Sequence, residues 1–305
     1  MGRIFYFVIL LLVSLPLFAQ NNYFELGLGY LYQKNNLAYD SDHKRIDDYS
    51  RPDDGFGSMV PIIRLNYGFD DMYIQSGGIG SKGGGIRLGY NTKNFLNSDT
   101  SFYFIYNIPR KVWENPYLLH QKRSHTYQHS FGAGIDINRI LGSKFSYSIN
   151  LIRDDVHNDE IGKIYDRLER DGFRIDQMLS REFSLNSHTT LNLAIGVERG
   201  AYEGSANSYL NYYLRGNLNY YFYTNYSIDV SYQLGYVDYD KKHPIFDKTR
   251  EDFDGNISIS IRKDKLLGFN NIYGNIYAGV GGSKSNINFY ETEAVFGGAS
   301  LGYLF

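Results

Sequence analysis

Histidine and serine side chains could supply the base and the nucleophile of a hydrolase. Such a triad needs both groups and an orienting acid within hydrogen-bond reach of one another. The neighbours His129 and Ser130 lie in a segment with strand-like alternation, and successive residues of a strand point to opposite faces. A lipid deacylase or phospholipase is therefore disfavoured. The seven histidines fall mostly in expected loops or turns: His43, His120, His125, His129, His157, His188 and His243.

Aspartates gather between residues 34 and 58, where they could serve a surface protease or bind calcium. The pairs Asp47-Asp48 and Asp53-Asp54 stand among serine, proline and glycine, a composition typical of solvated loops. The spacing is not that of an EF-hand. We predict a solvated acidic loop, no metal ion, no cofactor and no enzyme, with calcium binding as the alternative. The aspartates are Asp40, Asp42, Asp47, Asp48, Asp53 and Asp54.

A third set of charged residues recurs at alternate positions of apolar segments. Such a pattern places charges on one face of a strand, and on a lipid-facing surface an arginine would cost about 2 to 4 kcal/mol. We therefore expect these residues to line the lumen of a barrel, pairing in ladders across it, forming a polar permeation path, or both. They are Glu25, Arg64, Arg87, Asp136, Arg174, Asp176, Glu198, Arg215, Asp229 and Arg262.

The elements that must position these charges are strands. In residues 226–236, tyrosine, isoleucine, valine and leucine alternate with serine, aspartate, glutamine and glycine, the period of two of a strand between two environments. Each such segment is long enough to cross a bilayer when tilted. We predict an all-β fold, a transmembrane antiparallel outer-membrane β-barrel of fourteen strands, with twelve as the fallback. The strands are expected at residues 23–33, 59–67, 72–78, 84–91, 101–109, 128–138, 144–155, 172–183, 189–199, 209–222, 226–239, 253–263, 271–281 and 294–305.

Strand parity and loop lengths support this count. An even number of strands puts both termini of the chain on the periplasmic side. Such barrels also have short periplasmic turns and long outer loops. The long connections 34–58, 110–127, 156–171, 240–252 and 282–293 all fall outside, and residues 159–172 could form a short surface helix. The glycine-rich stretch from Ser76 to Gly85 is the weakest part of the pattern, because glycine there suggests a bulge, a plug or a small hairpin.

Both ends of the chain indicate export and outer-membrane assembly. Arg3 precedes an apolar run that ends in Leu17-Phe-Ala-Gln20, so residues 1–19 are predicted to be a cleaved signal peptide and 20–305 a single barrel domain. The last segment alternates and ends on Tyr303 and Phe305, the closing signal that we expect the barrel-assembly machinery to bind. The expected location is the cell outer membrane, in contact with its lipid and lipopolysaccharide.

Composition agrees with a barrel and excludes other classes. The chain has 30 tyrosines and 20 phenylalanines, and tyrosine suits the girdle where a ring meets lipid and its hydroxyl meets water. Mean hydropathy is -0.39, because a barrel hides its membrane signal in alternation. Without Arg3, 30 of the 31 basic residues remain against 33 acidic ones, a net charge of -3 that gives no case for nucleic acid. There is no cysteine, hence no thiol chemistry.

Two stretches near the carboxyl end carry a family resemblance. His243-Pro-Ile-Phe-Asp-Lys-Thr-Arg250-Glu-Asp252 and Ser285-Asn-Ile-Asn-Phe-Tyr290, with the closing Gly302-Tyr-Leu-Phe305, resemble an uncharacterised proteobacterial outer-membrane family, domain of unknown function 2860. A fainter likeness of Val60-Pro-Ile-Ile-Arg-Leu-Asn-Tyr67 is to the MltA-interacting protein (MipA/OmpV) barrels, which would imply a scaffold role for cell-wall enzymes. The resemblance implies location and architecture and brings no catalytic residue.

The residues support two functions of different classes. The first is a narrow passive channel for small hydrophilic solutes, because fourteen strands lie between the filled eight-stranded barrels and the open channels of 16 to 18 strands. The second is a structural or interaction barrel, a cell-envelope scaffold or surface-binding protein, whose lumen is filled by tyrosines. These are Tyr73, Tyr103, Tyr213, Tyr221, Tyr273 and Tyr277.

Overall fold

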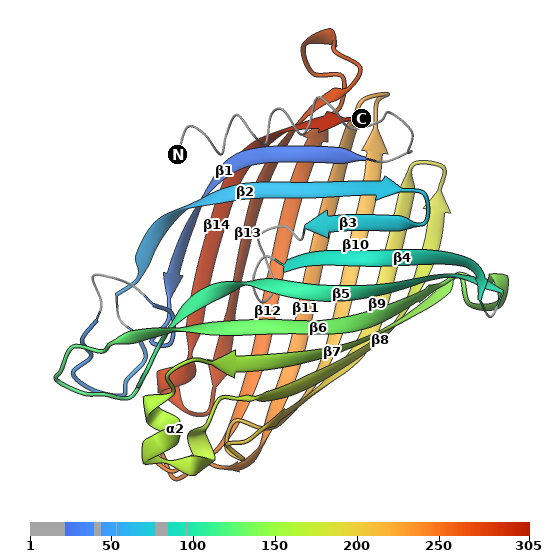
Figure 1. The fold of residues 1–305 in the computed structure, drawn as a ribbon. Helices are drawn as coiled ribbons and strands as arrows, with labels where there is room; N and C mark the ends of the chain where they lie inside the picture. The colour runs from blue at the N-terminus through green and yellow to red at the C-terminus, as the bar shows by residue number, and fades with distance from the viewer. Residues whose placement is uncertain (1–21, 40–43, 53, 77–84, 96) are drawn as a thin grey trace.

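The structure, a computed structural model, describes residues 22–305 except 40–43, 53, 77–84 and 96. The predicted signal peptide, residues 1–19, lies outside the described residues. Fourteen strands form one closed barrel, and each pairs antiparallel with its neighbours (Figure 1). The strands are β1 Tyr23–Lys34, β2 Phe56–Phe69, β3 Met72–Ser76, β4 Gly85–Phe95, β5 Ser98–Trp113, β6 His125–Asn138, β7 Phe145–Val156, β8 Gly172–Asn186, β9 Thr189–Tyr202, β10 Tyr209–Phe222, β11 Tyr226–Lys242, β12 Thr249–Lys263, β13 Ile272–Ser285 and β14 Thr292–Leu304.

The barrel closes where β1 meets β14. Their register runs without a break from Tyr23 opposite Leu304 to Lys34 opposite Glu293. Complete pairing removes the free sheet edge, and every backbone group inside a bilayer needs such a partner. The predicted count of fourteen is confirmed, and the fallback of twelve is wrong. The described part of the third strand, β3, covers five residues, up to the stretch 77–84 that lies outside the described residues.

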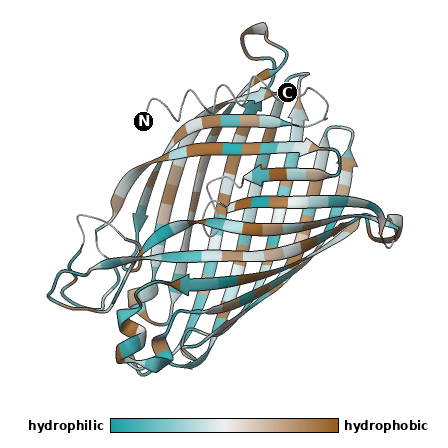
Figure 2. Ribbon diagram, viewed as in Figure 1, coloured by the Kyte–Doolittle hydropathy of each residue, from teal (hydrophilic) through white to brown (hydrophobic). Residues whose placement is uncertain are grey.

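Alternation divides each strand between two environments. On β1, Leu26 and Leu28 are exposed on the outer face, while Glu25, the residue before Leu26, is buried inside. Figure 2 shows the same alternation of hydrophobic and hydrophilic residues along the other strands. An apolar outer face is what lipid requires, because hydrocarbon offers no hydrogen bonds to polar groups.

Several strands run further than the apolar alternation predicts, and the outer loops are correspondingly shorter. β11 continues to Lys242 and β12 begins at Thr249, so the expected loop 240–252 shrinks to 243–248. Beyond the membrane both faces of a strand are wet, so the apolar period ends while the hydrogen-bond ladder continues. Of the two alternatives for residues 159–172, a surface helix or two strands that extend past the membrane, the helix forms as α2, Glu160–Ile164, followed by a 3-10 turn, Asp166–Leu168.

The ends of the barrel differ. Short turns such as residues 187–188 and 223–225 join the strands on the side of the carboxyl terminus, and the long loops gather with α2 at the other end (Figure 1). No helix among the described residues is both long and apolar enough to cross a membrane.

Candidate functional site: the lumen wall and the outer cap

Glu25 is the centre of a polar cluster that joins the strands on either side of the closing seam. Its side chain is 2% exposed, and its carboxylate lies 3.5 Å from the Arg64 guanidinium of β2. Side chains of three other strands contact this carboxylate of β1: Arg64 from β2, Ser300 from β14, and three residues from β13. The donors to that carboxylate are Ser300 (2.6 Å), Tyr273 (3.1 Å), Asn275 (3.2 Å) and Tyr277. We call Glu25, Arg64, Tyr273, Asn275, Tyr277 and Ser300 the seam cluster.

Arg87 of β4 and Asp136 of β6 belong to a second cluster, one on each side of β5. Their charged groups are 3.7 Å apart, and the guanidinium lies 4.6 Å from the centre of the Tyr103 ring. The Tyr103 hydroxyl donates to Asp136 (2.8 Å) and lies 2.9 Å from the Asn150 carbonyl. The ring thus carries a cation on its face and an anion at its hydroxyl, which satisfies both charges locally.

A third cluster surrounds Arg174 and is the most buried. Its guanidinium binds Asp154 of β7 at 2.6 Å and approaches Glu198 of β9 at 3.4 Å. Tyr202 donates to Asp154 at 2.8 Å and Tyr209 donates to Glu198 at 2.5 Å. The arginine therefore links three neighbouring strands near their outer ends.

The remaining predicted lumen charges have mostly neutral partners. Arg215 donates to Gln233 (2.6 Å) and lies 4.6 Å from the Tyr213 ring, whose hydroxyl donates to Asp176 (2.6 Å). Asp229 accepts from Asn219 at 2.7 Å. Arg262 pairs with Asp264 at 2.7 Å and lies 3.7 Å from the Tyr273 ring.

The ion pairs of these residues follow the wall. Glu25 and Arg64 stand on adjacent strands, as do Arg174 and its two carboxylates, while Arg87 and Asp136 are one strand apart. These pairs therefore do not form the expected ladders across the lumen. Strand pairing already holds the side chains of neighbouring strands within hydrogen-bond reach of one another. Side chains on opposite sides of the lumen are not brought together in this way.

Tyrosine rings also follow the wall. Tyr103 lies directly opposite Gly134 in the register, and a Cβ at that glycine would stand 2.5 Å from the ring. Tyr213 covers Gly196 in the same way. A glycine exposes backbone that an aromatic ring of the next strand can cover. Four of the tyrosines named for the alternative of a filled lumen lie against the wall in this way, which argues against their crossing the lumen: Tyr73, Tyr103, Tyr213 and Tyr273.

Sequence reasoning missed two residues of this wall. Arg110 was assigned to a loop, but a bulge between Asn107 and Arg110 shifts the register so that Arg110 stands opposite Gln128 and donates to it at 2.7 Å. Nothing in the alternation signals that shift beyond Pro109 itself. Asp154 was detectable, because it shares the parity of Asn150 on a strand that the sequence did predict.

The outer loops pack together into a second region, which we call the outer cap. Tyr117, between β5 and β6, is hydrogen-bonded to Tyr290, between β13 and β14, with 2.5 Å between the hydroxyls. Four strands separate these hairpins in one direction around the barrel and six in the other, so the contact spans the mouth. The cap has a hydrophobic core of Tyr117, Ile161, Leu168, Ala206, Ile287, Phe289 and Tyr290, with Leu37, Ile46, Tyr49, Ile245 and Phe246 packed against it.

His243 lies at the polar centre of the cap and is 2% exposed. Its Nδ1 accepts from the Ile245 N–H at 3.3 Å, which leaves the ring proton on Nε2. That Nε2 lies 2.8 Å from the Tyr290 hydroxyl and 3.2 Å from the Tyr117 hydroxyl. Burial lowers the pKa of His243 to about 3, and the Arg250 and Arg167 charges act in the same direction. Burial also raises the pKa of Tyr117 and of Tyr290.

The two stretches that carried the family resemblance meet in this cap. Phe246 packs against Phe289 with 5.6 Å between ring centres. Arg250 pairs with Asp252 and lies 3.5 Å from the Tyr290 ring. Segments about forty residues apart therefore build one structural unit.

Sites for hydrolysis or metal binding do not take shape among the described residues. Ser130 donates to Asp154 rather than to a histidine. Ser187 and His188 are hydrogen-bonded at 2.8 Å, but they lie exposed in a short turn. In the acidic loop, Asp47 contacts Arg45 and His120, and the described residues hold no group of three or more potential metal ligands. Asp40, Asp42 and Asp53 lie outside the described residues.

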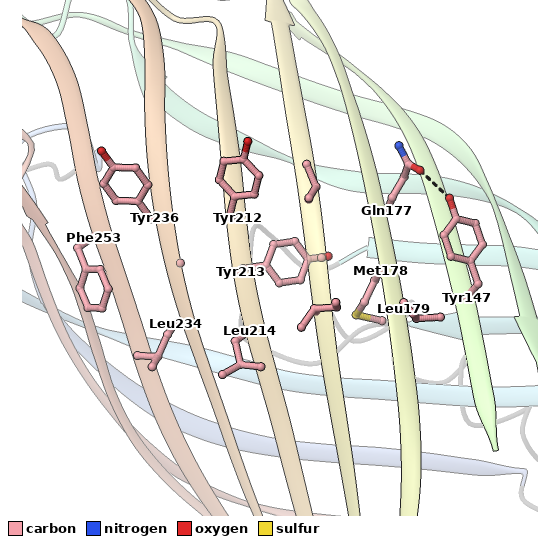
Figure 3. Close-up of a pocket in the computed structure, with 14 residues that line it drawn as sticks. Tyr147, Gln177, Met178, Leu179, Tyr212, Tyr213, Leu214, Leu234, Tyr236 and Phe253 are labelled. Carbon is pink, nitrogen blue, oxygen red and sulfur yellow. Dashed lines mark hydrogen bonds between the residues drawn. The ribbon is translucent and has the colours of Figure 1, made fainter.

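An apolar concavity of about 780 Å³ spans the wall from β7 to β12 (Figure 3). Leu179, Ile195 and Leu234 line it, and they are exposed outer-face residues of their strands. One polar pair crosses it, because the Tyr147 hydroxyl donates to Gln177 at 2.7 Å. The exposed leucine and isoleucine side chains make this an apolar surface on the outer face of the barrel.

Fold and surface together define the class of protein. A closed antiparallel barrel with an apolar outer face, a charged inner face and short turns at one end is an outer-membrane β-barrel. The family described as "Protein of unknown function (DUF2860)" matches residues 22–304, so the chain belongs to that family. No match to a curated protein was found.

Solved structures with a similar fold are outer-membrane proteins of low identity. An outer membrane channel from Pseudomonas putida F1 has a TM-score of 0.48 at 10% identity, with 94% of this chain and 97% of that chain covered. A Pseudomonas aeruginosa FadL homologue has a TM-score of 0.46 at 10% identity, covering 94% and 91%. The channel DcaP of Acinetobacter baumannii has a TM-score of 0.45 at 9% identity, covering 95% and 100%.

Proposed function

We propose that this barrel is a narrow passive channel for small hydrophilic solutes, with the outer cap closed over its mouth. The observation that carries the proposal is the solvent exposure of charged side chains on the inner face of the barrel. The side chain of Arg87 is 39% exposed and that of Asp136 is 28% exposed, although both are on the inner face. Exposed charges need water beside them, so the lumen is hydrated.

The arrangement of the tyrosines supports the same function. Rings that lie flat over glycines leave the centre of the barrel free, whereas rings that cross it would fill it. Fourteen strands also give a diameter between that of a filled barrel and that of an open porin. Small polar solutes are thus the class that such a lumen admits.

The proposal is tested by recording ion currents through purified, refolded protein in planar bilayers. The wild type is compared with Tyr290→Ala, which weakens the cap, and we expect larger or more frequent openings from the variant. Absence of current from both proteins would contradict the proposal.

Charge variants of the lumen refine the test. Because both signs line the wall, we expect weak ion selectivity, altered when Arg87, Arg215 or Asp229 is neutralised. Arg215 and Asp229 lie on adjacent strands, so reversing both should shift selectivity more than reversing either. Arg181→Gln is the matched control, because Arg181 packs against Phe145 and Phe183 on the outer face. An equal effect of this control would contradict a lumenal path.

The cap itself favours one alternative, a non-conducting interaction barrel. Loops with their own hydrophobic core present a fixed surface, as a binding protein would need. The same recordings separate the two functions, because an interaction barrel stays silent even when the cap is weakened.

A further inference from the structure

We propose that the outer cap is a lid that opens in acid, with His243 as the group that senses the proton. The inference depends on the proposed channel in one respect only: if the barrel is a channel, opening the lid lets solute flow. The lid itself stands on the geometry of the loops and can be tested without any current.

The loops of the cap can separate because the strand ladder of the barrel does not hold them together. Tyr117, Tyr290 and His243 all belong to connections between strands. Tyr49 also reaches across loops, its hydroxyl donating to the Tyr117 carbonyl at 2.9 Å. Opening the cap breaks loop-to-loop contacts and leaves the strand pairs intact, so it requires far less free energy than unfolding the barrel.

Protonation acts against the closed cap at a defined atom. A second ring proton must go on Nδ1 of His243, where the Ile245 N–H already points. Two donors would then face each other, and a charge would lie in a site that is 2% exposed. The closed cap therefore accepts only the neutral ring.

The groups around His243 do not compensate such a charge. Tyr117 and Tyr290 face it with neutral hydroxyls, and the charged groups that act on it, Arg250 and Arg167, are both cations. Among the described residues no carboxylate lies within ion-pair distance of this imidazole, whereas the exposed His120 has Asp47 at 3.3 Å. Both charges that act on the ring thus favour opening once it is protonated.

Linkage gives the size and the direction of the effect. His243 has a pKa of about 3 in the closed cap and an ordinary value near 6.5 when exposed. A depressed pKa stabilises the closed form above pH 6.5, and this contribution is lost as the pH falls toward 3. Between pH 7.5 and pH 5 the ratio of open to closed cap should rise about 30-fold.

Cysteine labelling can measure this opening, because the chain has no cysteine of its own. Ala206→Cys places a thiol in the core of the cap, where Ala206 is 3% exposed. Asp247→Cys places one on a loop where the side chain is 87% exposed. The ratio of their maleimide labelling rates removes the pH dependence of the thiol itself, and we expect this ratio to rise about 30-fold from pH 7.5 to pH 5.

Two histidine variants make the test specific. In His243→Gln the amide can still accept from Ile245 and donate to Tyr290 but does not titrate, so the labelling ratio should no longer depend on pH. His120→Gln is the matched control and should keep the full rise. A constant ratio in the parent, or a rise that survives His243→Gln, would overturn the lid.

Bilayer recordings at both pH values separate this inference from the channel. Acid-dependent labelling together with acid-dependent current supports both proposals. Acid-dependent labelling with no current at either pH supports the lid and contradicts the channel. Current without acid-dependent labelling contradicts the lid alone.

Discussion

The seam cluster and the outer cap hold the molecule together in different ways. The seam cluster ties strands that the backbone ladder already pairs, and it does so with a buried carboxylate and an arginine. The outer cap links loops from distant hairpins with apolar contacts and neutral hydrogen bonds. The comparison teaches that a buried carboxylate ties strands that the backbone already pairs, whereas the Tyr117–Tyr290 contact across the mouth is made by neutral groups.

The seam depends first on the end of the chain. The Phe305 N–H donates to the Asn22 carbonyl at 3.0 Å, and its ring packs edge-on against Tyr67. Deleting Phe305 should abolish assembly, because the final strand loses the aromatic end that we propose the assembly machinery binds. Heat-modifiable migration on gels and protease resistance measure the folded fraction. Phe305→Tyr keeps an aromatic end and serves as the control; normal migration of the deletion variant would contradict the prediction.

Most of the wall was predictable from sequence because one physical rule governs it. Alternation follows from lipid on one side and water on the other, so Glu25 and Arg174 could be assigned to strand faces by parity alone. Arg110 escaped because a bulge changes parity locally. The glycine-covering role of Tyr213 needs the strand register, which places Gly196 opposite it.

The cap could not be predicted in the same way. Tyr117 and Tyr290 are 173 residues apart, and loop residues have no period that reveals such a contact. The only signal was the family resemblance of the segments around His243 and Tyr290. The resemblance marked segments that contact each other in the structure, but it did not indicate that they form a cap.

Removing the carboxylate at the centre of the seam should have the next largest effect. Glu25→Ala leaves Arg64 and several hydroxyls without their acceptor, and should lower the free energy of unfolding by about 2 to 4 kcal/mol, since Arg64 is partly exposed. Urea titration with heat-modifiable migration measures it. Asp229→Ala, which loses a single hydrogen bond from Asn219, should cost under about 1.5 kcal/mol. Equal losses in the two variants would count against a special role for the seam.

Glycines under the tyrosine rings provide a smaller test of the wall. A Cβ at Gly196 would lie 2.1 Å from the Tyr213 ring, so Gly196→Ala must push the ring toward the lumen and away from Asp176. We expect a loss of about 1 to 3 kcal/mol and a smaller single-channel conductance. In Gly255→Ala the nearest atom, of Leu234, is 3.5 Å away, so this control should change neither quantity. An unchanged conductance in Gly196→Ala would mean that the ring does not border the path.

The smallest expected effect concerns the hydrogen bond between the hydroxyls of Tyr117 and Tyr290. Tyr290→Phe removes the nearer hydroxyl partner of His243, at 2.8 Å against 3.2 Å for Tyr117, as well as the bridge, so it should favour opening more than Tyr117→Phe does. The double variant should be less open than the two single effects added together, because both remove the same bond, with a coupling of about 1 kcal/mol. Labelling of the Ala206→Cys thiol at pH 7.5 measures cap opening in the parent, the two single variants and the double variant. Strictly additive effects would show that the hydroxyls act separately and that the apolar core, not the bridge between hairpins, keeps the cap closed.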